Sequence, residues 1–412
     1  MPDINSFTKT FPFDKTKAAG YLRQWEDLCK KDSGKLWGVS LYVPFVIIDE
    51  ETRDIVVNQD GFGDKFPEEL VAGTTAIKHK DQFWATANWN AVERYGDDGT
   101  ERMEMFVHEA FHALQPSLFG GETDFGSNAH LNELEARVLF LVEMSALLTA
   151  IKSSGEARFI AARSALYARM KRREKYGSMA EAPAELMEGT ANYTQYMVVN
   201  PNAYIPYLEN EVEKTQGDGI ARNFGYFSGA MYCYVLDVFG VNWKPGLTWD
   251  SDLGEILSAE IGVPTEPTCF FDEKYKNIMG IEIKLQEEKD RKIYTIINNF
   301  TTRPILRCSL ESDRGGTNMF IQLPNFGEIR RGVLQCSGAF GRMFVNSFDE
   351  LMKVLQSDGE FDFLEHKDGY CAVFAEGLQN DGKKVTGAYW TMELNEGYEI
   401  VADGNNYEVR KI

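Results

Sequence analysis

The sequence predicts an α+β protein with a small N-terminal β-sheet, a mainly helical middle part and a β-rich C-terminal domain. Runs rich in β-branched and aromatic residues occupy positions 36–48 and 55–57. Helical texture dominates from residue 101 to about residue 259, and beyond about residue 284 short apolar runs alternate with Gly, Asn and Asp turns. The 412 residues exceed the usual size of one domain, so we expect residues 1–100 and 101–280 to form one unit and residues 281–412 another.

The N-terminal part is predicted to contain one helix and several short strands. Ala18, Leu22 and Trp25 recur at helical spacing, which predicts a helix over residues 15–31. A polar stretch separates the first two β-rich runs, so these two runs are expected to form a hairpin. Two further strands are expected at residues 75–79 and 82–88.

The middle part is predicted to contain long helices at residues 131–152, 156–175 and 183–199. Pro183 suits the first turn of the last of these. Five basic residues near the end of the second helix predict a solvated face favoured by the helix dipole: Arg169, Lys171, Arg172, Arg173 and Lys175. In the C-terminal domain we expect one helix, at residues 347–356, among the strands, and no catalytic constellation.

The most informative stretch is FVHEAFHALQ at residues 106–115. His108 and His112 are four residues apart, so on a helix both imidazoles project from one face and can bind one metal ion. Neutral imidazole is a good zinc ligand, and Glu109 can act as a base toward a water molecule at the metal. Two histidines buried in an apolar core would give the same pattern, so a third ligand is needed to decide between the two interpretations.

A third ligand is offered by ELMEGTANY at residues 185–193. Glu188, Gly189, Ala191 and Tyr193 match an E-G-x-A-x-Y pattern. With both motifs in this order, the sequence resembles the gluzincin metallopeptidases, the thermolysin-like and aminopeptidase-like branch of the HExxH enzymes. The resemblance implies a zincin-like catalytic domain in which Glu188 is the third zinc ligand. Gly189 and Ala191 are small enough to let two helices approach closely.

The spacing of the two motifs departs from the family. Glu188 follows His112 by 188 − 112 = 76 residues, which implies an inserted pair of helices. Glu133 and Glu135 lie at the shorter separation that is usual in gluzincins, and both remain alternative third ligands. If Glu188 binds zinc, Glu135 becomes a candidate for supporting the site, with Arg137 as its candidate partner.

The resemblance also implies roles for residues beyond the ligands. Gluzincins usually carry a tyrosine or histidine that hydrogen-bonds the oxyanion of the transition state, and Tyr226 is the candidate here. The alternatives to it are Tyr232, Tyr193 and Arg222. Asn192, one turn after Glu188, stands where thermolysin-like enzymes often use an aspartate to orient a ligand histidine.

The strand expected at residues 82–88 lies just ahead of the histidine motif. In gluzincins an edge strand in this position binds the peptide backbone of the substrate by strand addition. The resemblance therefore implies Ala87 and Asn88 as substrate contacts. An ordinary strand packed through its aromatic side chains fits the same residues equally well.

These observations together predict a zinc-dependent peptidase. His108, His112 and Glu188 would hold Zn²⁺, and Glu109 would take a proton from the attacking water and deliver it to the leaving amine. A function of a different class fits the same motifs: a zinc-containing scaffold or binding module without peptidase activity, whose partner binds the C-terminal β domain.

The composition narrows the choice of partners and compartment. A formal net charge of −20 disfavours nucleic acid and anionic membranes, so a peptide or protein substrate is expected. The N-terminus shows no apolar segment typical of a signal peptide, and no apolar run is long enough to cross a bilayer, which favours the cytoplasm. Six scattered cysteines without a C-x-x-C pair predict reduced thiols: Cys29, Cys233, Cys269, Cys308, Cys336 and Cys371.

Overall fold

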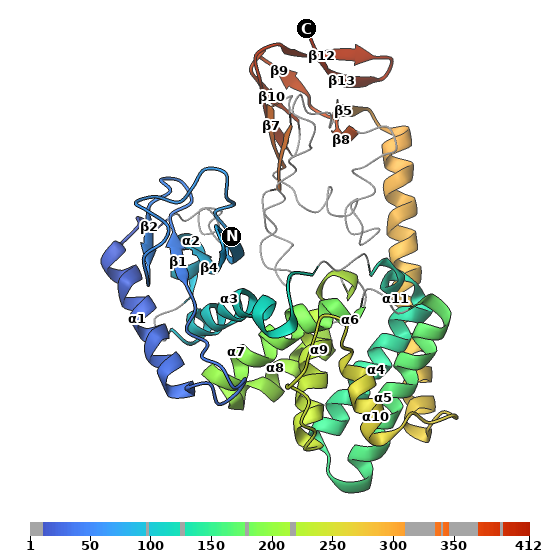
Figure 1. Cartoon of the computed structure of the whole chain (residues 1–412). Helices are drawn as coiled ribbons and strands as arrows, with labels where there is room; N and C mark the ends of the chain where they lie inside the picture. Colours follow the sequence, from blue (N-terminus) through green and yellow to red (C-terminus); the bar gives the residue numbers. More distant parts are fainter. Residues whose placement is uncertain are drawn as a thin grey trace. The chain divides into compact units, whose positions relative to one another are not determined.

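The computed structural model describes residues 11–95, 99–123, 128–177, 181–214, 220–309, 334–338, 341–345, 370–387 and 390–412. These residues form an α+β protein, as the sequence predicts (Figure 1). The chain divides into two compact units, Lys9–Glu282 and Ile283–Ile412. The first unit contains the N-terminal sheet and the helical part, with the histidine motif and Glu188.

The N-terminal sheet has the strand order β2-β1-β4-β3, and its strands are β1 (Phe45–Ile48), β2 (Ile55–Val57), β3 (Thr75–His79) and β4 (Gln82–Asn88). β1 pairs antiparallel with β2 and parallel with β4, and β3 pairs antiparallel with β4. The hairpin expected from the polar turn is confirmed. Four consecutive buried residues of β4, at positions 84–87, fit a strand with neighbours on both sides.

The prediction that β4 is an edge strand is wrong. Ala87 pairs with Ile47 of β1, while the preceding residue Thr86 pairs with Thr75 of β3, so both sides of the strand are occupied. Asn88 is also engaged: its side chain caps α2 (Trp89–Arg94) and donates to Glu50 at 2.7 Å. The backbone of β4 therefore cannot add a substrate strand at Ala87 and Asn88.

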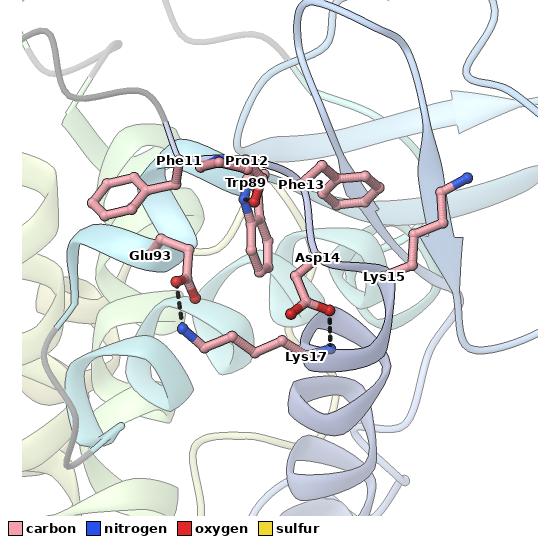
Figure 2. Close-up of a pocket in the computed structure, with 8 residues that line it drawn as sticks. All are labelled: Phe11, Pro12, Phe13, Asp14, Lys15, Lys17, Trp89 and Glu93. Atoms are coloured by element: carbon pink, nitrogen blue, oxygen red, sulfur yellow. Dashed lines mark hydrogen bonds and ion pairs between the residues drawn. The ribbon is translucent and has the colours of Figure 1, made fainter.

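The first helix, α1 (Lys15–Asp32), is joined to this sheet through its N-terminal end. Asp14 caps it by accepting from the backbone N–H groups of Thr16 and Lys17. Figure 2 shows that the Lys17 side chain reaches across to Glu93, with 2.5 Å between Nζ and Oε2. These contacts border a surface pocket of about 680 Å³, lined by Phe11, Pro12, Phe13, Asp14, Lys15, Lys17, Trp89 and Glu93. None of these residues belongs to the histidine motif or to the stretch around Glu188.

The helical part of the first unit begins with α3 (Thr100–Phe119), which carries the histidine motif. The expected inserted pair is α4 (Leu134–Lys152) and α5 (Gly155–Tyr176), which follow the short helix η2 (Ala129–Asn132). Glu188 then lies on a continuous helical run made of α6 (Glu181–Ala184), the π-helical turn η3 (Glu185–Gly189) and α7 (Thr190–Val199). The remaining helices are α8 (Pro201–Lys214), α9 (Ile220–Val238), α10 (Leu253–Ile261) and α11 (Cys269–Thr302).

The solvated face predicted for the basic run on α5 is confirmed for Lys171 and Lys175, whose side chains are exposed, and is wrong for the arginines. Arg169 and Arg172 are buried, with 3% and 0% of their surfaces exposed. Arg169 makes a bidentate pair with Glu185 at 2.8 and 2.6 Å, and Arg172 makes a bidentate pair with Glu181 at 2.8 and 2.9 Å. Glu143 of α4 binds both arginines. Arg169 and Arg172 are therefore part of a buried ionic network that joins α4 and α5 to the helical run bearing Glu188.

The described strands of the second unit form two sheets, with orders β6-β7-β11-β10-β9 and β12-β13-β5-β8. They are β5 (Ile305–Ser309), β6 (Leu334–Gly338), β7 (Gly341–Val345), β8 (Tyr370–Phe374), β9 (Gln379–Asn380), β10 (Lys384–Thr386), β11 (Trp390–Leu394), β12 (Tyr398–Asp403) and β13 (Asn406–Lys411). The β-rich texture is as predicted. The helix expected at residues 347–356 lies outside the described residues.

No helix in the described part of the chain combines the length and the apolar character needed to span a bilayer.

Candidate metal centre

The centre of the candidate site is the middle of α3. Phe106, Val107, Ala110 and Phe111 are fully buried and hold this segment in the core of the first unit. Their burial fixes the direction in which the remaining positions of the helix project. His108 and His112 share one face, with ring centroids 4.6 Å apart.

The π-helical turn η3 presents Glu188 to these histidines. A π turn is a one-residue bulge in a helix and is often found at functional sites, because it redirects side chains without ending the helix. Gly189 closes the turn where η3 packs against α9. A Cβ on Gly189 would lie 2.4 Å from the Cα of Gly229, so the two helical segments touch through their backbones. The close helix approach predicted for Gly189 is thus present, and Gly229 is its partner.

Three potential ligand atoms converge between α3 and η3. The Nε2 atoms of His108 and His112 are 3.0 Å apart, and Oε2 of Glu188 lies 3.4 Å from each of them. Tetrahedral zinc with bonds of about 2.0–2.2 Å separates its ligand atoms by roughly 3.3 Å, which is close to all three distances. Oε2 of Glu188 is buried and has no hydrogen-bond partner. A carboxylate oxygen that binds a cation has this kind of environment. The donor set and its spacing therefore fit zinc.

Among the described residues, this is the only group of three or more His, Cys, Asp or Glu side chains whose ligand atoms converge closely enough to hold a metal ion. Glu135 lies elsewhere: its exposed carboxylate pairs with Lys175 at 2.5 Å. The expected partner of Glu135, Arg137, instead binds the buried Glu282 at 2.6 Å, so that predicted pairing is wrong. Glu133 is the residue that precedes α4 and is not in the group.

Two glutamines hold the histidine rings. Oε1 of Gln195 lies 2.9 Å from Nδ1 of His108, and Oε1 of Gln115 lies 2.9 Å from Nδ1 of His112. In each case the glutamine contacts the ring nitrogen that faces away from Glu188. Histidines that bind a metal through one ring nitrogen usually make a hydrogen bond through the other. Sequence reasoning missed both residues. Their positions were a usable signal, because Gln115 is one helical turn after His112 and Gln195 is two turns after Glu188.

The role expected for Asn192 is therefore filled by other residues. Its amide nitrogen donates to the hydroxyl of Tyr207 at 2.9 Å, and no contact with either histidine is present. Its amide oxygen is buried and has no hydrogen-bond partner. The physical reason is the π turn, which changes the direction of the residues that follow Glu188 relative to a regular helix.

The candidate base Glu109 is buried beside the cluster, with 9% of its surface exposed. Burial raises the pKa of its carboxyl above the usual range, although the charges of His108 and His112 oppose this. At Glu188 burial acts in the same direction, but the ring nitrogens of His108 and His112, 3.4 Å from its Oε2, hold the pKa of that carboxyl well below its usual range. The site thus holds two carboxylates with opposite pKa shifts, which suits one as a proton carrier and the other as a ligand.

Tyr226 of α9 lies against the histidine pair. Its ring stacks on His108 with 5.8 Å between centroids and 8° between planes. Two of the alternatives to it make buried contacts elsewhere: Tyr193 donates to Asp237, and Tyr232 donates to Glu143 at 2.6 Å. The side chain of the third, Arg222, lies outside the described part of the structure. Of the described candidates, Tyr226 is the one in ring contact with a candidate ligand.

Comparison of the chain with protein-family models, with curated proteins and with solved structures finds no match. The assignment of a function therefore depends on the chemistry of this site.

Proposed function

We propose that the protein is a zinc-dependent metallopeptidase that hydrolyses peptide bonds, with His108, His112 and Glu188 as metal ligands. The observation that carries the proposal is the convergence of the three ligand atoms within 3.0 to 3.4 Å, next to the buried carboxylate of Glu109. The gluzincin resemblance of the two motifs supports the same assignment.

A zinc ion at this position would act as a Lewis acid toward the scissile carbonyl and lower the pKa of a water molecule beside it. Glu109 accepts the proton of that water and later delivers it to the leaving amine. Its raised pKa suits this double role, because an effective acid–base group has a pKa close to the working pH. The hydroxyl of Tyr226 donates a hydrogen bond to the oxyanion that develops on the carbonyl oxygen.

The substrate is proposed to be a peptide or protein. The net charge of −20 disfavours nucleic acid and anionic membrane surfaces as partners. A cytoplasmic location is part of the proposal. The described cysteines Cys29, Cys233, Cys269 and Cys308 are free thiols, which fits a reducing compartment.

The test is hydrolysis of a broad peptide library by the zinc-loaded full chain and by Glu109→Gln. We expect the variant to retain zinc by elemental analysis and to lose about 10²- to 10⁴-fold in rate, which is the contribution of a positioned general base. Glu135→Gln is the matched control, because it removes an exposed carboxylate that pairs only with Lys175 in the structure. Equal inertness of wild type and Glu109→Gln, with zinc bound in both, would instead favour a zinc-containing scaffold.

A further inference from the structure

Gln115 contacts both halves of the candidate metal site. Its side chain is buried, with 2% of its surface exposed, and lies between α3 and η3. Nε2 is 2.7 Å from the carbonyl oxygen of Met187, 3.2 Å from that of Leu186 and 3.0 Å from Oγ1 of Thr190. These three oxygens belong to the residues immediately around Glu188. A π turn disturbs the regular helical hydrogen bonds, and Gln115 supplies donors to the carbonyl groups of this one.

These contacts determine the orientation of the Gln115 amide. Carbonyl oxygens only accept hydrogen bonds, so the nitrogen end of the amide faces Leu186 and Met187. The oxygen end then faces Nδ1 of His112 at 2.9 Å and must accept from it. Nδ1 of His112 therefore carries a proton, which leaves Nε2, the nitrogen that faces Glu188, as the one that can bind a metal ion. One amide thus determines both the tautomer of a ligand histidine and the position of the turn that bears the third ligand.

Gln195 provides a natural comparison. Its Oε1 makes the same contact with Nδ1 of His108, at the same distance of 2.9 Å. Among the described residues, its side chain makes no hydrogen bond with a backbone carbonyl group, and its other polar neighbour is the hydroxyl of Tyr196. A hydroxyl group can rotate and either donate or accept, whereas a carbonyl oxygen cannot donate. The two glutamines therefore differ in their hydrogen bonds, because only Gln115 must be a donor on its far side, and in burial, because Gln195 is only half-buried.

We propose that Gln115 is a positioning residue that couples His112 to the π turn, so that the ligands on α3 and η3 keep their spacing. The inference rests on the proposed metal site and adds to it a residue that neither binds the metal nor touches the substrate. Arg169 contacts the same turn through its bidentate pair with Glu185. The turn bearing Glu188 is thus held through its backbone carbonyls by one residue and through a side chain by another.

The discriminating experiment compares Gln115→Glu with Gln195→Glu in the full chain. Zn²⁺ affinity is measured by competition with a chromophoric chelator. Both changes leave a carboxylate oxygen for the histidine, an arrangement that is common beside zinc. Gln115→Glu also sets a carboxylate against the carbonyls of Leu186 and Met187. We expect Gln115→Glu to weaken zinc binding by about 10- to 100-fold more than Gln195→Glu does. Equal effects of the two changes would overturn the proposal.

A second pair of variants and a second readout separate positioning from loss of folding. Gln115→Met and Gln195→Met each remove the contact with a histidine, but only the first also leaves the carbonyls of the π turn without their side-chain donor. We expect zinc affinity to fall about tenfold further in Gln115→Met. The visible spectrum of the Co²⁺-loaded chain should change in both Gln115 variants, while the unfolding of the metal-free chain stays cooperative. A wild-type Co²⁺ spectrum in both Gln115 variants would also overturn the proposal.

The outcomes distinguish this inference from the proposed function. Absence of Zn²⁺ binding by the wild-type chain would overturn both. Zinc binding by the wild type with unchanged affinity in Gln115→Glu would overturn the role of Gln115 and leave the proposed function standing. A third outcome is that the wild-type chain binds zinc but hydrolyses no peptide, and that Gln115→Glu binds zinc more weakly than the wild type. This outcome would support the positioning role within a zinc-containing scaffold.

Discussion

Replacing Gly229 by alanine tests whether the close packing of α9 on η3 sets the geometry of the site. A Cβ at this position would lie 2.2 Å from the carbonyl oxygen of Glu185, which is 3.4 − 2.2 = 1.2 Å short of ordinary van der Waals contact. The opposing atom is backbone, so the clash is relieved only if α9 and η3 move apart. Such a movement separates Tyr226 on α9 from Glu188 on η3.

The expected magnitudes follow from this displacement. Overpacking of a core contact costs about 1–3 kcal/mol of stability. A displacement of about 1 Å within a reacting arrangement can reduce the rate by about 100-fold. We therefore expect Gly229→Ala to lower the free energy of unfolding by about 1–3 kcal/mol and to lower kcat/KM by about 100-fold in the fraction that remains folded.

The assay combines denaturant unfolding with peptide hydrolysis, normalised to folded, zinc-loaded protein. Gly280→Ala is the matched control, because Gly280 lies within the helix α11 and a Cβ there meets no atom within 4 Å. That change should leave hydrolysis unaltered and stabilise the helix by about 0.5–1 kcal/mol. Wild-type stability and activity in Gly229→Ala would refute the reasoning, since the backbone contact would then not set the position of Tyr226.

Two further predictions concern acid and metal. Despite burial, Arg172 and His130 hold the pKa of Glu181 well below its ordinary value of 4.5. The contribution of Glu181 to stability is therefore complete above pH 4.5 and is lost as the pH falls below that value. Urea unfolding between pH 7 and pH 3 should show this loss, and Glu181→Gln should make the free energy of unfolding depend less steeply on pH. Zinc at 100 times its Kd should raise the free energy of unfolding of the wild-type chain by about 2.7 kcal/mol. The thermal unfolding of Glu188→Ala should no longer respond to zinc or to a chelator.

Much of the fold could be predicted from local patterns. Ala18, Leu22 and Trp25 recur at the helical period, and all three are buried in α1. The 76-residue separation of the two motifs and the helical texture of the segment between them likewise predicted the inserted pair α4 and α5. These features are readable because helical periodicity depends on neighbours three or four residues away.

Interactions between distant segments escaped sequence reasoning. Arg169 and Arg172 looked like solvated charges because Glu181 and Glu185, their partners, are on another helix. β4 was expected at an edge because gluzincins have an edge strand ahead of the histidine motif, and the residues of one strand do not say how many neighbours it has. Asn192 was expected to hold a histidine because a π turn cannot be read from the residues of ELMEGTANY.

The sequence by itself determined the chemical groups of the candidate site and the face that two of them share: His108 and His112 on one helix, Glu109 beside them and Glu188 in a second motif. Only the tertiary structure decided that Glu188, rather than Glu133 or Glu135, meets the histidines, and that Gln115 links the two halves. The physical reason is that spacing within one helix follows from backbone geometry, whereas a meeting across 76 residues depends on the packing of α9 on the π turn and on the ion pair that joins α5 to it.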